Sequence, residues 1–341
     1  MNEHSCHTKI YRKRIWFLSV AVFISEKEGK MVNRTKKNKG KLHYWIPVYL
    51  MMAPGLIYLF INNYIPMAGL ASAFKQVNFA DGIWGSPWAD PWYKNFIYLF
   101  KSKDAWIITR NTILYNFAFI LVNNIFGIII AIFISDVVSK KAKKVYQSAI
   151  LFPFLMSIVI VSYIVFALLS NENGLLNNSV LPALGMDPVN WYSTAGAWPV
   201  ILVIVNLWKG IGYGCLIYIA AIAGIDQSIY EAARIDGANR LQVICKITLP
   251  SLVPSIITLV MLSVSKIFFS DFGLFYQVPQ NSGAIYFTTN TIDTYVYRAL
   301  LQQNNPSMSA AAGFYQSVVG FVLVLAVNAL VRRFSKENAL F

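Results

Sequence analysis

An all-α membrane protein with six transmembrane helices is the fold class that this sequence predicts. The composition is the first reason, because 57% of the 341 residues are hydrophobic and 13% are charged, whereas a soluble domain carries about 25% charged residues. The second reason is a series of six apolar segments that are each long enough to cross a bilayer. The third is the uneven distribution of Lys and Arg between the loops, which predicts that both termini lie in the cytoplasm.

Basic residues dominate the stretch before the first apolar segment, residues 1–43. Within it, Ile15 to Ser25 is apolar but spans only about eleven residues, and a bilayer core needs roughly 20. The stretch imitates a signal peptide, yet no small-residue cleavage site follows it. Met31 is a plausible translation start just before the first span. We therefore interpret residues 1–30 as a superfluous translated extension or a mobile tail.

The six apolar segments are the predicted transmembrane helices. Their bounds are about Tyr44–Tyr64, Asn111–Ser135, Tyr146–Leu169, Trp198–Gly224, Pro250–Phe269 and Met308–Val331. With the amino terminus inside, the inside segments carry 21 Lys and Arg and the outside segments carry 6. Since basic loops stay in the cytoplasm, this asymmetry places both termini and residues 225–249 there. It also explains the net charge of +14 without a nucleic-acid partner.

Aromatic residues are concentrated in the first outside loop. They are Trp84, Trp88, Trp92, Tyr93 and Trp106. Such rings can stack on sugars or form a docking surface, but they also suit an interfacial belt with short surface helices, which is the interpretation that we favour.

Polar side chains occur inside the spans, where they are costly in lipid and should face other helices or a water-filled path. The candidates for a substrate path are Asn123, Asn206, Trp208, Lys209 and Tyr213. Lys209 lies near the middle of its span, so it needs a counter-charge, a polar cavity or a ligand. Simple contact between helices remains the alternative for the whole group.

The loop between the fourth and fifth spans is the longest stretch in the second half of the chain that cannot lie in lipid. Its pattern predicts two short helices with a sharp turn between them. Ser228 and Glu231 have the spacing of a capping box, and Asp226 is a competing cap. Gly237 stands where the chain needs a residue that tolerates positive φ, and Asn239 can cap the second helix.

A motif of fixed spacing runs through this loop into the fifth span. Glu231-Ala232-Ala233 is followed after three residues by Gly237, and after nine more by Ile247, one further residue and Leu249-Pro250. This motif resembles the EAA loop of ABC importer permeases. Residues 231–238 look most like the carbohydrate branch, the maltose-permease-like permeases that depend on a binding protein. The alternative is that Glu231 only caps a helix, which would leave the other fixed positions unexplained.

The resemblance covers about Thr109 to Arg333, and it implies the type I ABC importer permease fold. Residues 294–298 and Asn328 are similar to those of a subgroup of oligosaccharide and polysaccharide permeases. The expected domains are a basic tail at 1–43, the first helix and outside loop at 44–108, a transmembrane domain at 109–333 with the coupling loop at 225–249, and a tail at 334–341.

By the same resemblance, the coupling loop docks into a groove of an ATPase subunit. The coupling residues would be Glu231, Ala232, Ala233, Asp236, Gly237, Ile247, Leu249 and Pro250. The other implied partners are a second homologous permease, a second ATPase subunit and an extracytoplasmic solute-binding protein, all at the plasma membrane of a bacterium. The substrate would be an oligosaccharide, and the cation of Lys209 raises the alternative of an acidic one.

Some function classes are not expected from the sequence. It contains no G-x-x-x-x-G-K-[ST] loop, so ATP and Mg are expected on the partner ATPases, with no cofactor on this chain. Its three His do not build a metal site, and no catalytic constellation is visible. The open alternatives are a secondary transporter, which often pairs ionisable residues at the midplane, a membrane-embedded enzyme or assembly factor, and a permease for a non-sugar solute.

Overall fold

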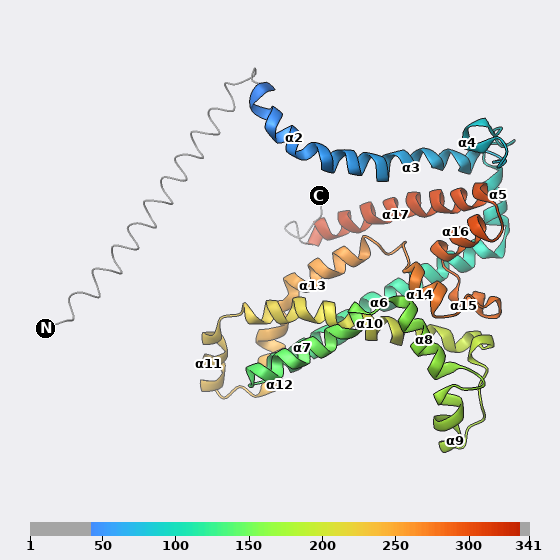
Figure 1. The fold of residues 1–341 in the computed structure, drawn as a ribbon. Coiled ribbons are helices and arrows are strands. Elements are labelled where there is room, and N and C mark those ends of the chain that lie inside the picture. Colours follow the sequence, from blue (N-terminus) through green and yellow to red (C-terminus); the bar gives the residue numbers. More distant parts are fainter. Residues whose placement is uncertain (1–41, 335–341) are drawn as a thin grey trace. The chain divides into compact units, whose positions relative to one another are not determined.

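The computed structural model describes residues 42–334, which fold into helices (Figure 1). These residues divide into two units, 42–68 and 69–334. The two predicted tails, and with them the extension inferred for residues 1–30, fall almost wholly outside the described residues. Each unit has its own packing, and the second contains the features on which function depends.

The first unit is one continuous helical segment. It contains α2 (Leu42–Leu59), the π-helical turn η1 (Phe60–Tyr64) and α3 (Ile65–Met67). The predicted span Tyr44–Tyr64 is confirmed as part of a longer candidate span, Trp45–Phe74. Its large apolar side chains are exposed, including Leu50 and Met51. Lipid or another protein must therefore cover this helix.

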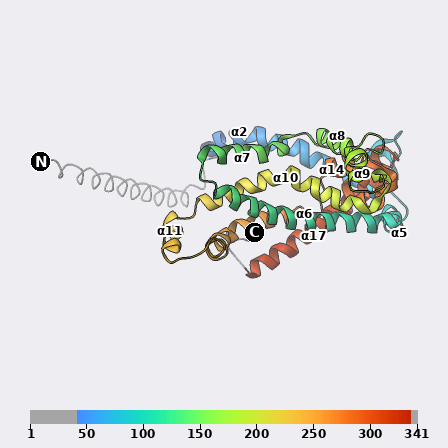
Figure 2. The same ribbon diagram turned by 90° about the horizontal axis from the view of Figure 1, so that it is seen from below.

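Three long helices lie side by side in the second unit (Figures 1 and 2). They are α6 (Lys103–Ser135), α7 (Lys140–Leu155) and α10 (Trp198–Ala223). Gly212 of α10 permits a close approach, because a Cβ atom there would lie 2.2 Å from the carbonyl oxygen of Ile150 in α7. Farther along α10, Cys215 and Tyr218 share a buried cluster with Ala131 of α6.

The third predicted span is broken, so the expectation of one continuous helix over Tyr146–Leu169 is wrong. Instead, α7 gives way to α8 (Ile158–Leu169) at a bend of 93°. Pro153 lies in the last turn of α7, and the Ser157 hydroxyl accepts a hydrogen bond from the amide of Val159 at the start of α8. One helix ends and another is capped inside a single apolar run.

The remaining predicted spans are helices whose ends differ from the prediction. The second begins earlier, at Lys103, and the fourth matches to one residue. The fifth, α13 (Leu249–Val264), ends before the predicted Phe269, and the sixth, α17 (Pro306–Phe334), extends beyond the predicted Met308–Val331. Within residues 42–334, five helices are long and apolar enough to cross a membrane, or six if the bent pair counts as one span.

Short helices fill the connections between the spans. They are η2 (Ala68–Phe74), α4 (Gly82–Gly85), α5 (Lys94–Lys101), η3 (Leu176–Val180), α9 (Leu181–Ala183), η4 (Trp191–Ser193), η5 (Ala195–Ala197), α14 (Phe272–Gln277), η7 (Gly283–Ile285), α15 (Tyr286–Thr289) and α16 (Ile292–Leu301). The first outside loop thus contains short helices, as expected. Its four Trp side chains and Tyr93 are exposed, and their membrane-interface role stays a prediction.

A buried arginine organises α16. Arg298, which is 7% exposed, donates hydrogen bonds to Asn281 Oδ1 at 3.0 Å, to Thr294 Oγ1 at 3.2 Å and to Asn290 Oδ1. Its guanidinium lies 4.1 Å from the ring centroid of Tyr286. Burial lowers the pKa of Arg298 below its ordinary value. The sequence motif that contains this arginine therefore has a structural role, because it ties α16 to the preceding loop.

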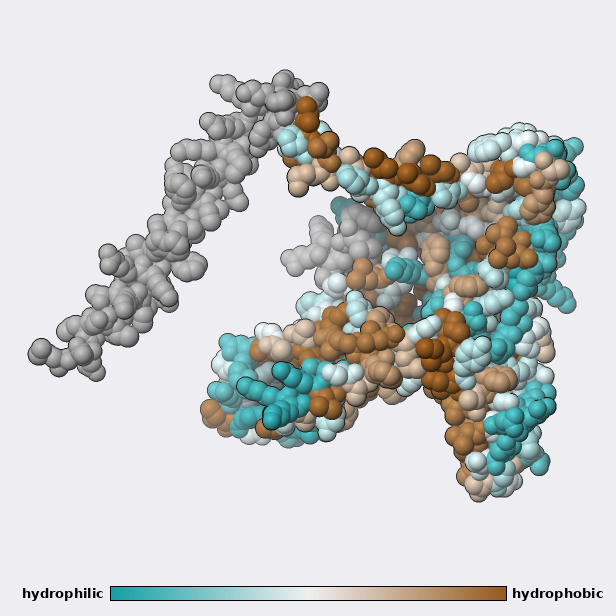
Figure 3. Space-filling view, viewed as in Figure 1, coloured by the Kyte–Doolittle hydropathy of each residue, from teal (hydrophilic) through white to brown (hydrophobic). Residues whose placement is uncertain are grey.

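Hydropathy divides the surface of the second unit. Figure 3 shows hydrophobic side chains over the middle of the long helices and hydrophilic ones over the end that carries α11 (Gln227–Ile235) and α12 (Arg240–Val243). An apolar middle with polar ends is the surface that a membrane-spanning helical unit requires.

Candidate functional site

The loop between α10 and α13 projects from one end of the long helices (Figure 1). It consists of α11, the short α12 and the π-helical turn η6 (Ile244–Thr248), which runs directly into α13. Pro250 lies in the first turn of α13, as predicted, because its missing amide leaves no hydrogen bond unmade there.

Asp226 caps the start of α11. The amide of Ser228 donates a hydrogen bond of 2.9 Å to Asp226 Oδ1, and the backbone of Asp226 is extended, as a capping residue requires. The predicted capping box of Ser228 and Glu231 is therefore wrong, and the competing cap is confirmed, because Ser228 is already inside the helix. The same hydrogen bond lowers the pKa of the exposed Asp226 carboxyl below its ordinary value.

The turn after α11 follows the predicted chemistry. Gly237 has a φ of 74°, a conformation that side chains with a Cβ atom rarely adopt. The amide of Ala238 donates to the carbonyl oxygen of Ala233 at 2.9 Å, which closes the helix end. Asn239 then caps α12 in a capping box with Gln242, whose hydrogen bonds measure 2.9 and 2.8 Å.

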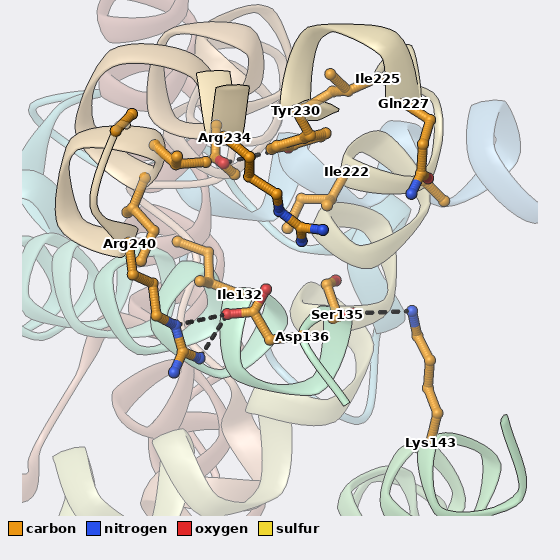
Figure 4. Close-up of a pocket in the computed structure, with 15 residues that line it drawn as sticks. Ile132, Ser135, Asp136, Lys143, Ile222, Ile225, Gln227, Tyr230, Arg234 and Arg240 are labelled. Carbon is orange, nitrogen blue, oxygen red and sulfur yellow. Dashed lines mark hydrogen bonds and ion pairs between the residues drawn. The ribbon is translucent and has the colours of Figure 1, made fainter. Parts of the chain in front are cut away.

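The side chains of α11 differ in their surroundings, even where they lie one helical turn apart. Gln227, Tyr230 and Arg234 line a pocket of about 700 Å³ that the ends of α6 and α10 also line (Figure 4). Tyr230 is tied to η6, because its hydroxyl lies 3.2 Å from Thr248 Oγ1. Glu231 does not line the pocket and is exposed to solvent.

The other predicted coupling residues lie in α11, in the turn after it, or where the loop enters α13. Ala232, Asp236 and Gly237 are exposed, while Ala233 is half-buried. Three more residues follow where η6 enters α13: Ile247 and Leu249, which are half-buried, and Pro250, which is exposed. The structure thus gathers all eight predicted residues in one loop, and their contact with a partner stays a prediction.

The pocket contains charged residues that sequence reasoning missed. The Arg240 guanidinium and the Asp136 carboxylate form an ion pair of 2.6 Å, and Lys143 donates a weak hydrogen bond of 3.5 Å to the carbonyl oxygen of Ser135. Lys143 lies on α7, eight residues after Ser135 at the end of α6, whereas Arg240 on α12 is 104 positions from Asp136. In the sequence, the lysines around Lys143 were interpreted only as positive charge of a cytoplasmic loop.

The substrate-path candidates fall into two groups. Asn123 of α6 donates a hydrogen bond of 2.8 Å to Asn206 Oδ1 of α10. Lys209 donates to the carbonyl oxygens of Phe154 at 3.1 Å and Met156 at 2.8 Å, at the break between α7 and α8. This mid-span cation therefore meets the carbonyl groups that the break leaves open.

Aromatic rings extend the second group. Tyr213 stacks on Phe154 with ring centroids 5.3 Å apart and an interplanar angle of 17°. Trp208, one residue before Lys209, is 41% exposed. The group thus offers ring faces beside an ammonium, which suits a sugar, but a substrate path through it stays a prediction.

A comparison with protein families decides what kind of chain this is. Residues 123–336 match the model of the family described as binding-protein-dependent transport system inner membrane component. The chain belongs to this family.

Individual permeases of the family support the same assignment. The polygalacturonan/rhamnogalacturonan transport system permease protein YteP of Bacillus subtilis (strain 168) is 33% identical over 294 residues, which cover 85% of this chain and 89% of YteP. Protein LplB of the same bacterium is 31% identical over 292 residues, which cover 85% of this chain and 90% of LplB.

Two solved structures have the same fold. A bacterial ABC transporter involved in the import of the acidic polysaccharide alginate matches with a TM-score of 0.77 and 32% identity, covering 89% of this chain and 99% of its own. A bacterial alginate ABC transporter in complex with alginate pentasaccharide-bound periplasmic protein matches with a TM-score of 0.76 and 32% identity, covering 86% and 97%.

The predicted family and fold class are confirmed by these matches. The chain is a multi-pass membrane protein and the permease of a binding-protein-dependent ABC importer. It is a transport subunit and not an enzyme, so the alternatives of a secondary transporter and of a membrane-embedded enzyme are not supported.

Proposed function

We propose that this permease forms half of the translocation path of an ATP-driven importer for an acidic oligosaccharide. The observation that carries the proposal is the exposure of Glu231 and Ala232 on α11, outside the pocket that other side chains of this helix line. An exposed carboxylate beside small side chains suits docking into a groove on an ATPase subunit.

The caps make α11 a well-defined link between two spans. Asp226 fixes its start, Gly237 fixes its end, and η6 joins the following α12 to α13 without an intervening loop. Closure of two ATPase subunits on ATP would shift the ends of α10 and α13 together and change which side of the membrane the path faces. Only partners that bind the two states with different affinity can drive such a change.

The spans also need covering by a partner. In the four unbroken spans of the second unit, only 17–28% of the residues in the most apolar window are buried. A second homologous permease would cover part of this surface and close the path, and lipid would cover the rest. The Lys and Arg asymmetry places the α11 end in the cytoplasm of a bacterium and the solute-binding protein on the other side of the plasma membrane.

The relatives support an acidic sugar as the substrate. YteP belongs to a transport system for polygalacturonan and rhamnogalacturonan, and the two solved relatives transport alginate. Lys209 can contribute to such a preference here, because an ammonium has three donors and the two carbonyl groups at the α7–α8 break take two of them.

The test compares acidic with neutral substrates. The complete importer is reconstituted in vesicles with its solute-binding protein, and uptake of a galacturonate trisaccharide is compared with that of a neutral trisaccharide at equal saturation of the binding protein. The acidic sugar should be transported faster, and Lys209→Gln should lose acidic uptake selectively. Transport of neutral sugar alone would contradict the acidic substrate, and equal loss of both would leave Lys209 with only a role in packing.

A further inference from the structure

The pocket between α11 and the ends of the long helices has an excess of positive charge. Three cations line it, Lys143, Arg234 and Arg240, against one carboxylate, Asp136. Only Arg240 is paired with that carboxylate. Arg234 points into the space in front of Ser135 and Asp136 (Figure 4), and its guanidinium forms no hydrogen bond or ion pair with any residue among 42–334.

A hydroxyl in the same pocket also lacks a partner. Ser135 Oγ is buried and has no hydrogen-bond partner among the described residues, although an unsatisfied buried polar atom costs free energy. Lys143 spends at most one of its three donors on the carbonyl oxygen of Ser135, at the weak distance of 3.5 Å. The pocket therefore holds several free donors around one space.

The helix ends do not cancel this charge. The carboxyl ends of α6 and α10, which contribute Ser135 and Ala223 to the lining, carry partial negative charge. Lys143 and the Asp136–Arg240 pair lie at these ends and offset it, and the Arg234 guanidinium remains. Guanidinium is the side chain best suited to two-pronged binding of a tetrahedral oxyanion.

We propose that this pocket binds a phosphate-bearing anion through Arg234, Lys143 and the Ser135 hydroxyl. The pocket lies at the polar end of the membrane-spanning helices, where an anionic lipid headgroup and free phosphate are both within reach. The bound anion would link α11 to the end of α6 and the start of α7, and so steady the coupling loop against the long helices.

A carboxylate of the ATPase subunit is the competing occupant, and the test below separates it from a phosphate-bearing anion. Gln227, Tyr230 and Arg234 line the pocket, while Glu231, one helical turn after Gln227, lies outside the lining and is exposed. An ATPase side chain that filled the pocket would make it inaccessible before any anion is added. The ends of α6 and α10 form part of the pocket wall.

The test measures occupancy of the pocket directly. Gln227, which lines the pocket, is replaced by Cys in a chain without other cysteines, and the complete importer is placed in phosphatidylcholine nanodiscs in a phosphate-free buffer. The rate of alkylation of this cysteine is then followed in three samples: without additions, with 30% phosphatidylglycerol in the nanodisc, and with millimolar inorganic phosphate.

The expected result is alkylation slowed several-fold by phosphatidylglycerol, by inorganic phosphate or by both, with the pattern identifying the source of the anion. The double change Arg234→Gln and Lys143→Gln should abolish the slowing, while Arg234→Lys should keep part of it because the charge remains. Lys144→Gln is the matched control, since Lys144 is the neighbouring lysine on α7 and does not line the pocket.

Two outcomes overturn the proposal. One is an alkylation rate that neither anion changes, and this includes a rate that is slow from the start, because protein would then fill the pocket. The other is the same slowing in the Arg234→Gln, Lys143→Gln variant as in the unchanged chain. Neither readout depends on transport, so a failure here is separable from a failure of the proposed substrate or coupling.

Discussion

Three residues set the shape of the coupling loop through backbone hydrogen bonds and backbone conformation. Asp226 accepts from the amide of Ser228, Asn239 accepts from the amide of Gln242, and Gly237 adopts the positive φ between them. Asp226 and Asn239 each cap the start of a helix, and Gly237 allows the chain to turn after one. The Glu231 carboxylate takes part in none of the hydrogen bonds found among the described residues, so it is free for a partner.

Replacing Glu231 with Lys should reduce both transport and the ATP hydrolysis that is coupled to it. A carboxylate buried against a basic residue of the ATPase would become a like charge, and loss of such a pair costs roughly tenfold or more in affinity. Uptake and transport-stimulated ATP hydrolysis should fall together in vesicles. Glu231→Gln, which keeps the size and removes the charge, should fall between. Normal coupled uptake by an inserted Glu231→Lys permease would exclude this role.

Replacing Gly237 with Val should also reduce coupling, for a conformational reason. A β-branched residue is strained at a φ of 74°, so α11 would lose its fixed angle to α12. Gly214→Val is a useful control for bulk, because a Cβ atom at Gly214 meets nothing within 4 Å. Hydrogen exchange at the amides of α11 should accelerate in Gly237→Val and stay unchanged in the control.

The cap at Asp226 has a defined pH dependence. Because a hydrogen bond lowers the pKa of Asp226 in the folded chain, its contribution to stability is present above the carboxyl's ordinary pKa and is lost as the pH falls through the lowered one. Relative to its intrinsic rate, hydrogen exchange at the amide of Ser228 should therefore accelerate in the unchanged chain as the pH falls through the lowered pKa. Asp226→Asn, which keeps an acceptor without a titrating group, should show no such step, and exchange at neutral pH should be fastest in Asp226→Ala. Equal exchange in both variants would contradict the cap.

Local rules explain which of these residues were predictable. Gly237, Asn239 and Pro250 obey turn and capping chemistry that needs only their neighbours. The choice between Asp226 and Ser228 depended on where the helix begins, which local spacing leaves open. The Asp136–Arg240 pair joins residues 104 positions apart, so no local pattern reveals it.

At the scale of elements, the contact between α7 and α10 relies on the absence of a side chain. A Cβ atom at Gly212 would press on the backbone of Ile150 and Leu151 at 2.2 to 2.9 Å. Backbone cannot yield as a flexible side chain does, so the two helices would have to separate.

Gly212→Ala should therefore destabilise the permease, by about 1–3 kcal/mol if it behaves like other overpacked sites. Gly214 lies two residues further along the same helix, and a Cβ atom there would meet nothing within 4 Å. Gly214→Ala should therefore be neutral or slightly stabilising. Thermal unfolding of the detergent-purified importer would compare the two. A Gly212→Ala protein as stable as Gly214→Ala would show that the contact can relax.

The existence of each span was predictable because length and apolarity suffice for that. The break in the third span was not, because Pro153, Met156 and Ser157 interrupt a run that stays apolar enough to cross. A proline is tolerated in many transmembrane helices, so its presence alone does not end one. Here two contacts complete the break: Ser157 caps the start of α8, and the Lys209 ammonium donates a hydrogen bond to the carbonyl oxygen of Met156.

At the scale of the whole molecule, orientation in the membrane is the open prediction on which the coupling role depends. A cysteine at Ser179 should react with an impermeant thiol reagent added to intact cells, in a background without native cysteines, and a cysteine at Ser139 should not. Both positions are exposed, so access to the side of the membrane decides the result. The opposite labelling pattern would place α11 outside and exclude its contact with an ATPase.

The candidate site was predictable in part at this scale. The spacing from Glu231 to Pro250 identified the loop before its shape was known, because the motif lies in one continuous segment. The pocket behind it was not predictable, since its lining comes from α6, α7, α10 and α11. Lys209 was recognised as a mid-span cation, but its carbonyl partners exist only because the third span bends.

The bend in the third span gives neighbouring spans different mechanical properties. The fourth span, α10, is an unbroken helix of 26 residues, whereas the third consists of two helices that meet at 93°. Both of these helices pack against α10: α7 at Gly212, and α8 through Val161, which shares a buried cluster with Trp198 of α10. Because Lys209 of α10 binds the carbonyl groups at the bend itself, a change of angle at the bend has to alter these hydrogen bonds.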